Sequence, residues 1–180
     1  MIKIQLTVDQ FNRINKFGKK YNGTKDNSRQ NLRYTRLTIQ DNRLIAEGLD
    51  GYKVFNLELE IENLSNKNGH IYIEPGKNFK KSDNHVIITE EEKEIRLESI
   101  KGDDIRIINK VDFDFFNTKD IIKDDNPVFK ISFDPKKLKD ALDAYDDKVI
   151  TLEFFGEHEQ VKITNRLDSK SMLLPVRLPN

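Results

Sequence analysis

The stretch that decides the fold is the last part of the chain, 128–180, which reads VFKISFDPKKLKDALDAYDDKVITLEFFGEHEQVKITNRLDSKSMLLPVRLPN. Phe129–Phe133 alternates like a short strand and leads into Asp134-Pro135. Aspartate is a good helix N-cap, and proline at the first helical position loses no hydrogen bond. The helix expected next has one apolar stripe, formed by Leu138, Ala141, Leu142 and Tyr145. Three strands should follow, over Val149–Phe155, Gln160–Asn165 and Met172–Leu178.

The start of the chain repeats this order of strand, helix and three strands. Ile2–Leu6 alternates, Thr7 is a suitable N-cap, and an apolar helical face begins at Phe11 and is weakened by Gly18. After a polar loop, Asn22–Asn31, strands are predicted over Leu32–Gln40, Arg43–Gly48 and Tyr52–Ile61. Lys3–Thr7 also aligns with Lys130–Asp134, and a repeated unit that cannot bury its own sheet face implies that such units pair.

The middle of the chain reads as a third, degraded copy of the unit. Gly69–Lys81 enters a turn at Pro75, and Gly76 and Asn78 leave little room for a helix. Strands are predicted over Val86–Thr89, Glu94–Ile100 and Ile105–Val111, and the acidic, aromatic Asp112–Asn126 is interpreted as a connector. We therefore expect one domain over residues 1–118, made of two units of which the second has a reduced helix, and a half-domain over residues 119–180.

Composition excludes several classes of protein. Lys+Arg 31 balances Asp+Glu 31 for a net charge of +0, so any contact with DNA must come from a local segregation of charge. Cys 0 excludes disulfides and thiolate metal sites, and this fits a reducing cytoplasm. The N-terminal MIKIQLTVDQ has no long apolar core and no later run approaches the length of a membrane span, so neither a signal peptide nor a membrane contact is expected.

The last part of the chain resembles the closing half-domain of the bacterial DNA polymerase III beta subunit family, the sliding clamps. The residues that carry the resemblance are Phe133–Leu138, Asp140–Leu142 and the terminal Leu174–Leu178, because family members end in a hydrophobe-Pro-hydrophobe-Arg-Leu segment. The resemblance implies a short, divergent member with an α+β fold, in which antiparallel sheets lie outside and helices pack on the inner face. It also implies that the chain forms an oligomer if a ring closes.

The resemblance implies that basic helix residues meet the phosphates of double-stranded DNA, through contacts that are non-specific and sensitive to salt. The positions of this kind are Arg13, Lys16, Lys19, Lys20, Lys25, Arg29, Lys136 and Lys137. Arg13, Lys16 and Lys20 share one face of the first helix. An ordinary solvated helix face is the alternative.

Partner proteins of the family insert a short hydrophobic peptide into a pocket on the last domain. The matching positions here are Met172, Leu174, Pro175, Val176, Arg177 and Leu178. An apolar pocket with one arginine suits a peptide with aliphatic or aromatic anchors. The alternative is that Leu174, Val176 and Leu178 only form the buried face of an edge strand.

No catalytic constellation is recognisable. His70, His85 and His158 lie far apart without metal-ligand spacing, and the acidic pairs and triplets have the composition of turns. No cofactor and no metal are expected. The resemblance therefore predicts a non-catalytic processivity factor, or a docking platform for a DNA polymerase, that acts in DNA replication. Two alternatives remain open: a clamp mimic that competes for clamp partners without encircling DNA, and a metal-dependent nuclease built on the acidic turns.

Overall fold

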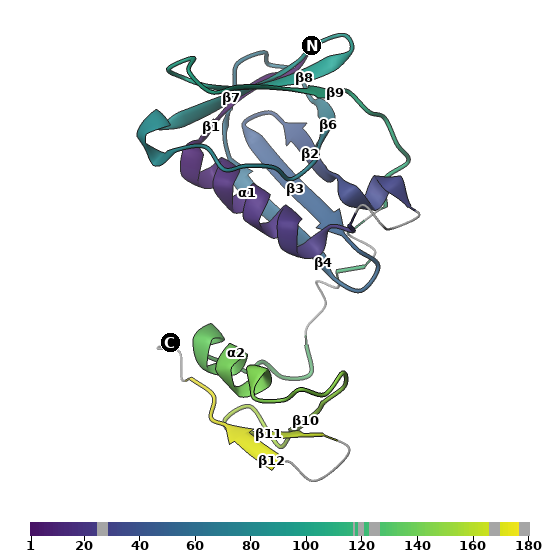
Figure 1. Ribbon diagram of the computed structural model, residues 1–180, viewed down its shortest axis with the longest axis vertical. Helices are drawn as coiled ribbons and strands as arrows, with labels where there is room; N and C mark the ends of the chain where they lie inside the picture. The colour runs from purple at the N-terminus through teal and green to yellow at the C-terminus, as the bar shows by residue number, and fades with distance from the viewer. Residues whose placement is uncertain (25–28, 117, 119–120, 123–126, 166–169, 177–180) are drawn as a thin grey trace. The chain divides into compact units, whose positions relative to one another are not determined.

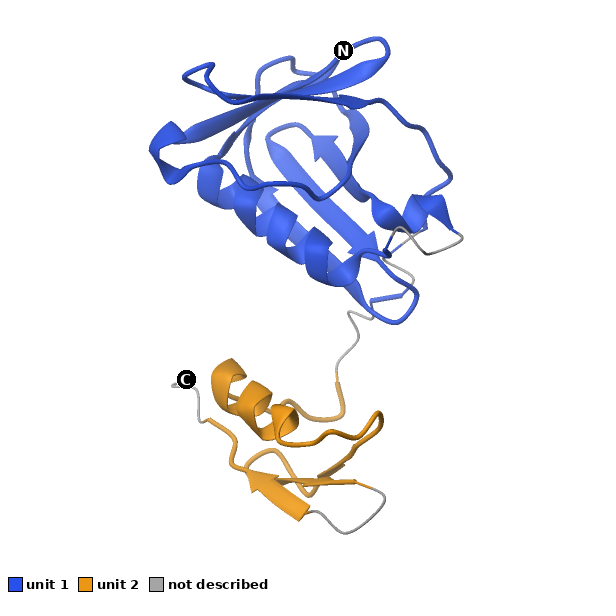
Figure 2. Ribbon diagram, viewed as in Figure 1, with its two compact units in different colours: residues 1–123 blue, residues 124–180 orange. Residues whose placement is uncertain are grey.

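The computed structural model describes all residues except 25–28, 117, 119–120, 123–126, 166–169 and 177–180 (Figure 1). The chain forms two compact units, residues 1–123 and 124–180, which are described separately below (Figure 2). The sequence placed the division between residues 118 and 119. No described helix is long and apolar enough to cross a membrane.

Unit 1 contains two half-units with the same order of elements. The first half-unit consists of β1 (Lys3–Thr7), α1 (Val8–Tyr21), β2 (Thr35–Gln40), β3 (Arg43–Leu49) and β4 (Val54–Glu60), with a 3₁₀ turn, η1, at Gln30–Arg33. The second consists of β6 (Gly69–Ile73), the 3₁₀ turn η2 (Lys81–Asp83), β7 (His85–Glu90), β8 (Glu94–Ser99) and β9 (Ile105–Asn109). A two-residue strand, β5 (Glu62–Asn63), links them. The structure has strands where the sequence predicts them in this region, except that Leu32 and Arg33, the start of the predicted strand Leu32–Gln40, lie in η1. The second half-unit has the 3₁₀ turn η2 where the first has α1.

The two half-units exchange their first strands. One sheet has the order β5-β1-β7-β8-β9 and the other β4-β3-β2-β6. Thus β1 of the first half-unit lies antiparallel to β7 of the second, with Thr7 opposite His85, and β6 of the second lies antiparallel to β2 of the first, with Ile73 opposite Thr35. Each half-unit therefore supplies three strands of its own sheet and receives a fourth from the other, and β5 is the fifth strand of the first sheet.

The core of unit 1 lies between the two sheets and α1. Alternating residues of β1, β7 and β8 on one side and of β2, β3 and β6 on the other are buried, and they form one cluster with Val8, Phe11 and Ile14 of α1. Strand alternation places these side chains on the inner faces of the sheets, and the helical repeat places the α1 residues on one stripe. Antiparallel sheets with few helices therefore form an α+β fold, as predicted.

Helix α1 begins where the sequence predicts. The side chain of Thr7 accepts from the backbone N–H of Gln10, and the Gln10 side chain accepts from the Thr7 N–H, which is a capping box. Gly18 does not end the helix, which continues to Tyr21. The residue is needed for packing, because a Cβ at Gly18 would lie 2.5 Å from Pro75 Cγ and 2.8 Å from Thr35 Oγ1.

We expect Gly18→Ala to lower the free energy of unfolding, against the usual rule for helix glycines. Overpacking costs about 1–3 kcal/mol, and the better helix propensity of alanine offsets about 1 kcal/mol, so the net loss is about 1 kcal/mol. Urea denaturation followed by far-UV circular dichroism measures it. Lys16→Ala, an exposed position of the same helix, is the control and should change stability by less than about 0.5 kcal/mol. A more stable Gly18→Ala protein would show that the close approach to Pro75 is not limiting.

A buried ion pair ties the outer face of the β2–β3 sheet to the segment after β9. Arg36 Nε and Nη2 donate to Glu47 Oε2 at 3.0 and 2.8 Å, and the Thr118 hydroxyl hydrogen-bonds the other carboxylate oxygen. The Arg36 guanidinium also lies 4.8 Å from the centre of the Phe115 ring. The first part of the predicted connector is therefore packed on unit 1, through Phe113 and Phe115 against Tyr72.

Unit 2 is a single half-unit. It consists of α2 (Pro135–Asp143), β10 (Thr151–Phe154), β11 (Val161–Thr164) and β12 (Lys170–Leu173), with the strands in the order β10-β11-β12. The predicted cap is confirmed, because Asp134 Oδ1 accepts from the backbone N–H groups of Lys136 and Lys137. Helix α2 lies over one face of the sheet (Figure 1), and Tyr145, just after it, donates its hydroxyl to the Ile163 carbonyl at 2.9 Å.

Two strand predictions for unit 2 are wrong: one strand does not form, and the other has different bounds. Phe129–Phe133 forms no strand, because alternation describes an extended chain but a strand also needs a partner. Within the described residues, one backbone hydrogen bond holds this segment: the Val176 N–H donates to the Ser132 carbonyl, at 2.7 Å. The last strand is Lys170–Leu173 and not Met172–Leu178; residues 174–176 leave the ladder, and Arg177 and Leu178 lie outside the described residues.

Candidate nucleic-acid interface and candidate peptide surface

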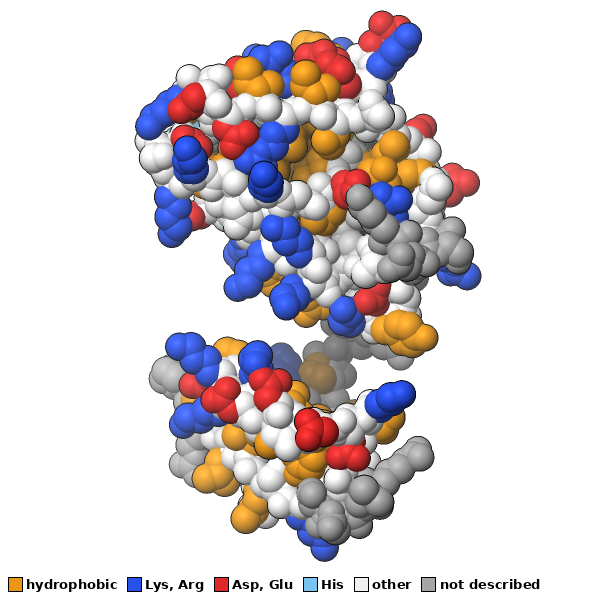
Figure 3. Space-filling model, viewed as in Figure 1, with side chains coloured by type: hydrophobic (Ala, Val, Ile, Leu, Met, Phe, Trp, Pro, Cys, Tyr) orange, Lys and Arg blue, Asp and Glu red, His pale blue; other side chains and the backbone are white. Residues whose placement is uncertain are grey.

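The outward face of α1 is basic. Its inward stripe buries Val8, Phe11, Ile14, Asn15 and Gly18, and this leaves Arg13, Lys16, Lys19 and Lys20 exposed. Lys19 and Lys20 stand in the last turn, where they also favour the negative end of the helix dipole. Figure 3 shows lysine and arginine side chains gathered over this part of unit 1.

The positive charge of this face is not neutralised within the described part of the chain. No described carboxylate forms an ion pair with Arg13, Lys16, Lys19 or Lys20, whereas the one acidic residue of α1, Asp9, lies 3.7 Å from Lys81 Nζ. Lys53 Nζ donates to the Lys20 carbonyl at 2.6 Å, but it is paired with Asp50 at 3.0 Å and so adds no net charge at the end of the helix. The face therefore presents cations that can bind phosphate groups.

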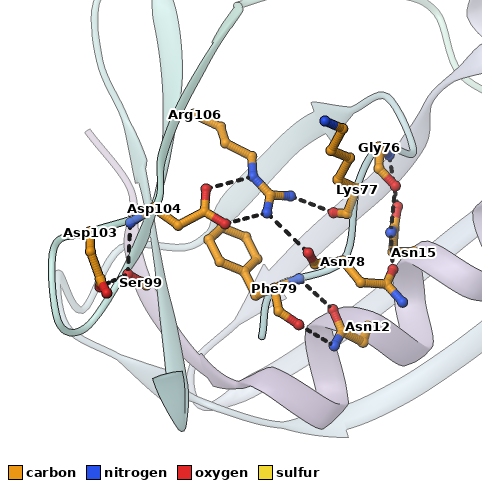
Figure 4. Close-up of polar contacts among 10 residues, drawn as sticks. All are labelled: Asn12, Asn15, Gly76, Lys77, Asn78, Phe79, Ser99, Asp103, Asp104 and Arg106. Atoms are coloured by element: carbon orange, nitrogen blue, oxygen red, sulfur yellow. Dashed lines mark hydrogen bonds and ion pairs between the residues drawn. The ribbon is translucent and has the colours of Figure 1, made fainter. Parts of the chain in front are cut away.

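The segment between β6 and η2 runs beside α1, and two asparagines of the helix hold it there (Figure 4). Asn15 exchanges hydrogen bonds of 2.8 Å with both the N–H and the carbonyl of Gly76, and Asn12 does the same with Phe79 at 3.0 Å. Since an asparagine side chain has both a donor and an acceptor, it replaces the strand partner that this backbone lacks. The segment carries two exposed lysines, Lys77 and Lys80, and a third, Lys81, follows at the start of η2.

These lysines were missed by sequence reasoning, although a signal was present. Asn12 and Asn15 are polar residues three positions apart at the edge of the buried stripe of α1, and buried side-chain amides require partners. The sequence showed the asparagines but not the backbone that they bind.

An arginine of β9 holds the same segment from the other side. Arg106 donates to the carbonyls of Lys77 and Asn78, and its guanidinium lies 3.8 Å from the centre of the Phe79 ring, which packs edge-on against Phe11. Arg106 also donates to both oxygens of Asp104 at 2.6 and 2.9 Å, and this hydrogen bonding lowers the pKa of Asp104. A carboxyl with a lowered pKa stabilises the fold above its unfolded pKa and loses this contribution as pH falls through the folded one.

The remaining predicted DNA contacts are not all brought together. Arg29 is exposed in the loop after α1, and Lys25 lies outside the described residues. Lys136 and Lys137 are exposed in the first turn of α2, which belongs to unit 2. In the next turn, Lys139 is paired with Asp143, so the basic character of α2 is confined to its start.

The predicted peptide site lies open at the end of unit 2. Met172 and Leu174 are each 71% exposed, Val176 is 42% exposed and Pro175 is half-buried. Met172 pairs with Lys162 on the sheet face opposite to α2. The described residues of the site therefore form an apolar surface, and the arginine of the motif, Arg177, lies outside the described part.

No group of three His, Asp or Glu side chains within the described ranges is arranged to hold a metal ion. The acidic residues of the turns serve other purposes. Asp103 accepts from Ser99 at 3.1 Å within the β8–β9 turn, and Asp50 accepts from the N–H groups of Tyr52 and Lys53 in the β3–β4 turn.

The fold is that of solved DNA polymerase sliding clamps. The DNA polymerase III beta chain from Streptococcus pneumoniae superposes with a TM-score of 0.74 at 15% identity, over 98% of this chain and 49% of that chain. The DNA polymerase III subunit beta from Pseudomonas aeruginosa gives 0.73 at 13% identity, over 97% and 50%. The sliding clamp from Bacillus subtilis gives 0.53 at 13% identity, over 98% and 64%.

This likeness is one of fold. Neither a protein-family model nor a curated protein matches the sequence. The chain spans between about half and two thirds of the length of the solved clamps that it matches.

Proposed function

We propose that this chain, which has the fold of the DNA polymerase III beta sliding clamps, is a non-catalytic processivity factor. In this role it holds double-stranded DNA through phosphate contacts and docks a DNA polymerase during replication in the cytoplasm. The observation that carries the proposal is the basic face of α1: four exposed cations without a carboxylate partner in the described chain, in a fold shared with clamps.

The neighbourhood of α1 supports this reading over an ordinary solvated face. A solvated helix face usually mixes both signs of charge, but here the one acidic residue, Asp9, is paired with Lys81. Lys77 and Lys80 add positive charge on a segment that Asn12, Asn15 and Arg106 fix in place. Positive charge at fixed positions suits sequence-independent binding to phosphates.

Retention on DNA of different topology tests the proposal. A protein that encircles the duplex is retained on closed circular DNA and lost when the circle is linearised. A protein that only binds phosphates is retained equally on circular and on linear DNA. Retention should be measured after a wash at moderate salt, with and without a clamp loader. Equal loss from both forms of DNA would reject encirclement, and absence of any binding at low salt would reject the DNA-binding function.

The apolar end of unit 2 is the proposed docking surface for the partner polymerase. We expect Leu174→Ala with Val176→Ala to weaken binding of a hydrophobic clamp-binding peptide by about 10-fold or more, because truncation of central apolar anchors costs more than about 1 kcal/mol. Fluorescence anisotropy of a labelled peptide measures it. Tyr52→Ala, which removes an exposed aromatic side chain from unit 1, is the control. Unchanged affinity in the double variant would place the peptide elsewhere.

A further inference from the structure

Unit 1 shows how two half-units of this chain complete each other. The strands β1-β7-β8-β9 and β6-β2-β3-β4 follow the same order, and in both cases the first strand comes from the other half-unit. The receiving strand is always the one after the helical segment, β7 or β2, and the pairing is always antiparallel. A complete domain therefore needs two half-units, each of which gives one strand and receives one.

Unit 2 is a half-unit whose first segment has a hydrogen-bond partner on one side only. Its segment Phe129–Phe133 occupies the position of β1, before the N-cap of the helix. On one side, the bond from Val176 N–H to the Ser132 carbonyl reproduces the pairing of β5 with β1, where Gln5 lies opposite Glu62. On the other side β1 pairs with β7, but no described strand pairs with this segment of unit 2.

The receiving strand of unit 2, β10, is also open at its outer edge. Leu152 and Phe154 are 39% and 44% exposed, whereas Val86 and Ile88 of β7 are fully buried. Both side chains lie on the inner face of the sheet, because their cross-strand partners on β11, Ile163 and Val161, are buried. The inner face of the sheet is covered up to β11. Beyond it the Phe154 ring packs against the Phe129 ring of the same chain, with centroids 6.1 Å apart, but no described strand pairs with the outer edge of β10. An open apolar strand edge of this kind is a site of strand addition.

We propose that two copies of the chain join through unit 2, each laying Phe129–Phe133 antiparallel to β10 of the other. The same half-unit carries both the strand to be given and the edge that receives it, so a second copy satisfies both at once about a two-fold axis. Unit 1 does not supply the missing half-unit, since its receiving strands β2 and β7 are already occupied. The joined units form a complete domain with the strand order of unit 1. This inference rests on the topology and not on the proposed function.

The β1–β7 register predicts which residues meet. Thr7, the cap of α1, lies opposite the first residue of β7. The same rule sets Asp134 opposite Thr151 of the second copy and Ser132 opposite Glu153 of the second copy. Ile131 and Phe133 then face Phe154 and Leu152 of the second copy on the inner side, as Ile4 and Leu6 face Ile88 and Val86 in unit 1.

Cysteine cross-linking tests this register, and the chain has no native cysteine to interfere. Ser132→Cys and Glu153→Cys should be placed in two full-length chains that carry different tags, co-expressed and oxidised. We expect a disulfide-linked mixed pair as the main product on a non-reducing gel. The control combines Ser132→Cys with Lys162→Cys, because Lys162 lies opposite Glu153 one strand further in. About 5 Å of extra separation places that thiol beyond disulfide reach.

Light scattering of the full chain supplies the second measurement. A mass of two chains or a multiple of two is expected, against 21.1 kDa for one chain. Leu152→Asp with Phe154→Asp should reduce the mass by half with the circular dichroism spectrum unchanged, and Tyr52→Asp should leave it unchanged.

Three results would overturn the inference: a mass of one chain at micromolar concentration, absence of the mixed cross-link, or a two-chain mass that the β10 variant does not alter. The last result would show that a different surface joins the copies. A one-chain protein whose β10 edge is protected from hydrogen exchange would show that something other than a second copy covers it.

Discussion

Charge reversal of Arg13, Lys16 and Lys20 to glutamate is expected to abolish retention of circular DNA. The three side chains share the exposed face of α1, and none has a carboxylate partner in the described chain. Each phosphate contact releases about one counterion, so the plot of log affinity against log salt should become shallower by about three. Filter binding or fluorescence anisotropy across a salt series measures the slope, and the topology assay measures retention.

A second triple variant separates local from global charge. Lys67→Glu, Lys93→Glu and Lys148→Glu change the net charge by the same amount, at exposed positions that belong neither to α1 nor to the segment beside it. This control should keep most of the affinity and the steep salt dependence. If both triple variants behave alike, DNA responds only to the net charge of the protein, and the face of α1 has no special role.

Removal of Arg36 is expected to cause the largest loss of stability, about 3–5 kcal/mol for Arg36→Ala. Its partner Glu47 lies directly opposite on β3, with a side chain only 4% exposed. Without the guanidinium, the carboxylate would remain buried with the Thr118 hydroxyl as its only described hydrogen-bond partner. The Phe115 ring would also lose its cation, which loosens the segment after β9. Urea denaturation at neutral pH measures the loss.

Two controls show whether burial of the charge is the cause. Lys81→Ala removes an exposed pair with Asp9 and should cost less than about 0.5 kcal/mol. Arg36→Leu combined with Glu47→Leu removes both charges and should recover much of the stability lost in Arg36→Ala, because no unpaired charge remains. An Arg36→Ala protein as stable as the Lys81→Ala protein would contradict this account and would mean that water reaches Glu47.

The local elements could be predicted from the sequence because their causes are local. Thr7 and Asp134 cap helices with side chains that act within three residues, and strand alternation marked the strands of unit 1 correctly. The strand exchange could not be predicted in this way, since the partner of β1 is β7, far along the chain. Alternation also assigned a strand to Phe129–Phe133, although its receiving edge is absent from the described part of the chain.

The candidate site was predicted only in part for the same reason. The helical repeat placed Arg13, Lys16 and Lys20 on one face without knowledge of the fold. The lysines of the neighbouring segment depend on hydrogen bonds from Asn12 and Asn15 to a backbone more than sixty residues away. Gly18, read as a weakness of the helix, is explained by the nearness of Pro75. Both features arise from tertiary contacts, which no spacing rule contains.

The crossed placement of β1 and β6 has a consequence during synthesis. When the nascent chain has left the ribosome only as far as β4, β1 has no partner, because the strand that it pairs with, β7, has not been made. At about 5–20 residues per second, translation needs about 4 to 16 s to pass from β1 to β7. Over that interval Ile4 and Leu6 have no neighbour from β7 to cover them, so unit 1 stays incomplete and exposes apolar side chains until β7 is made.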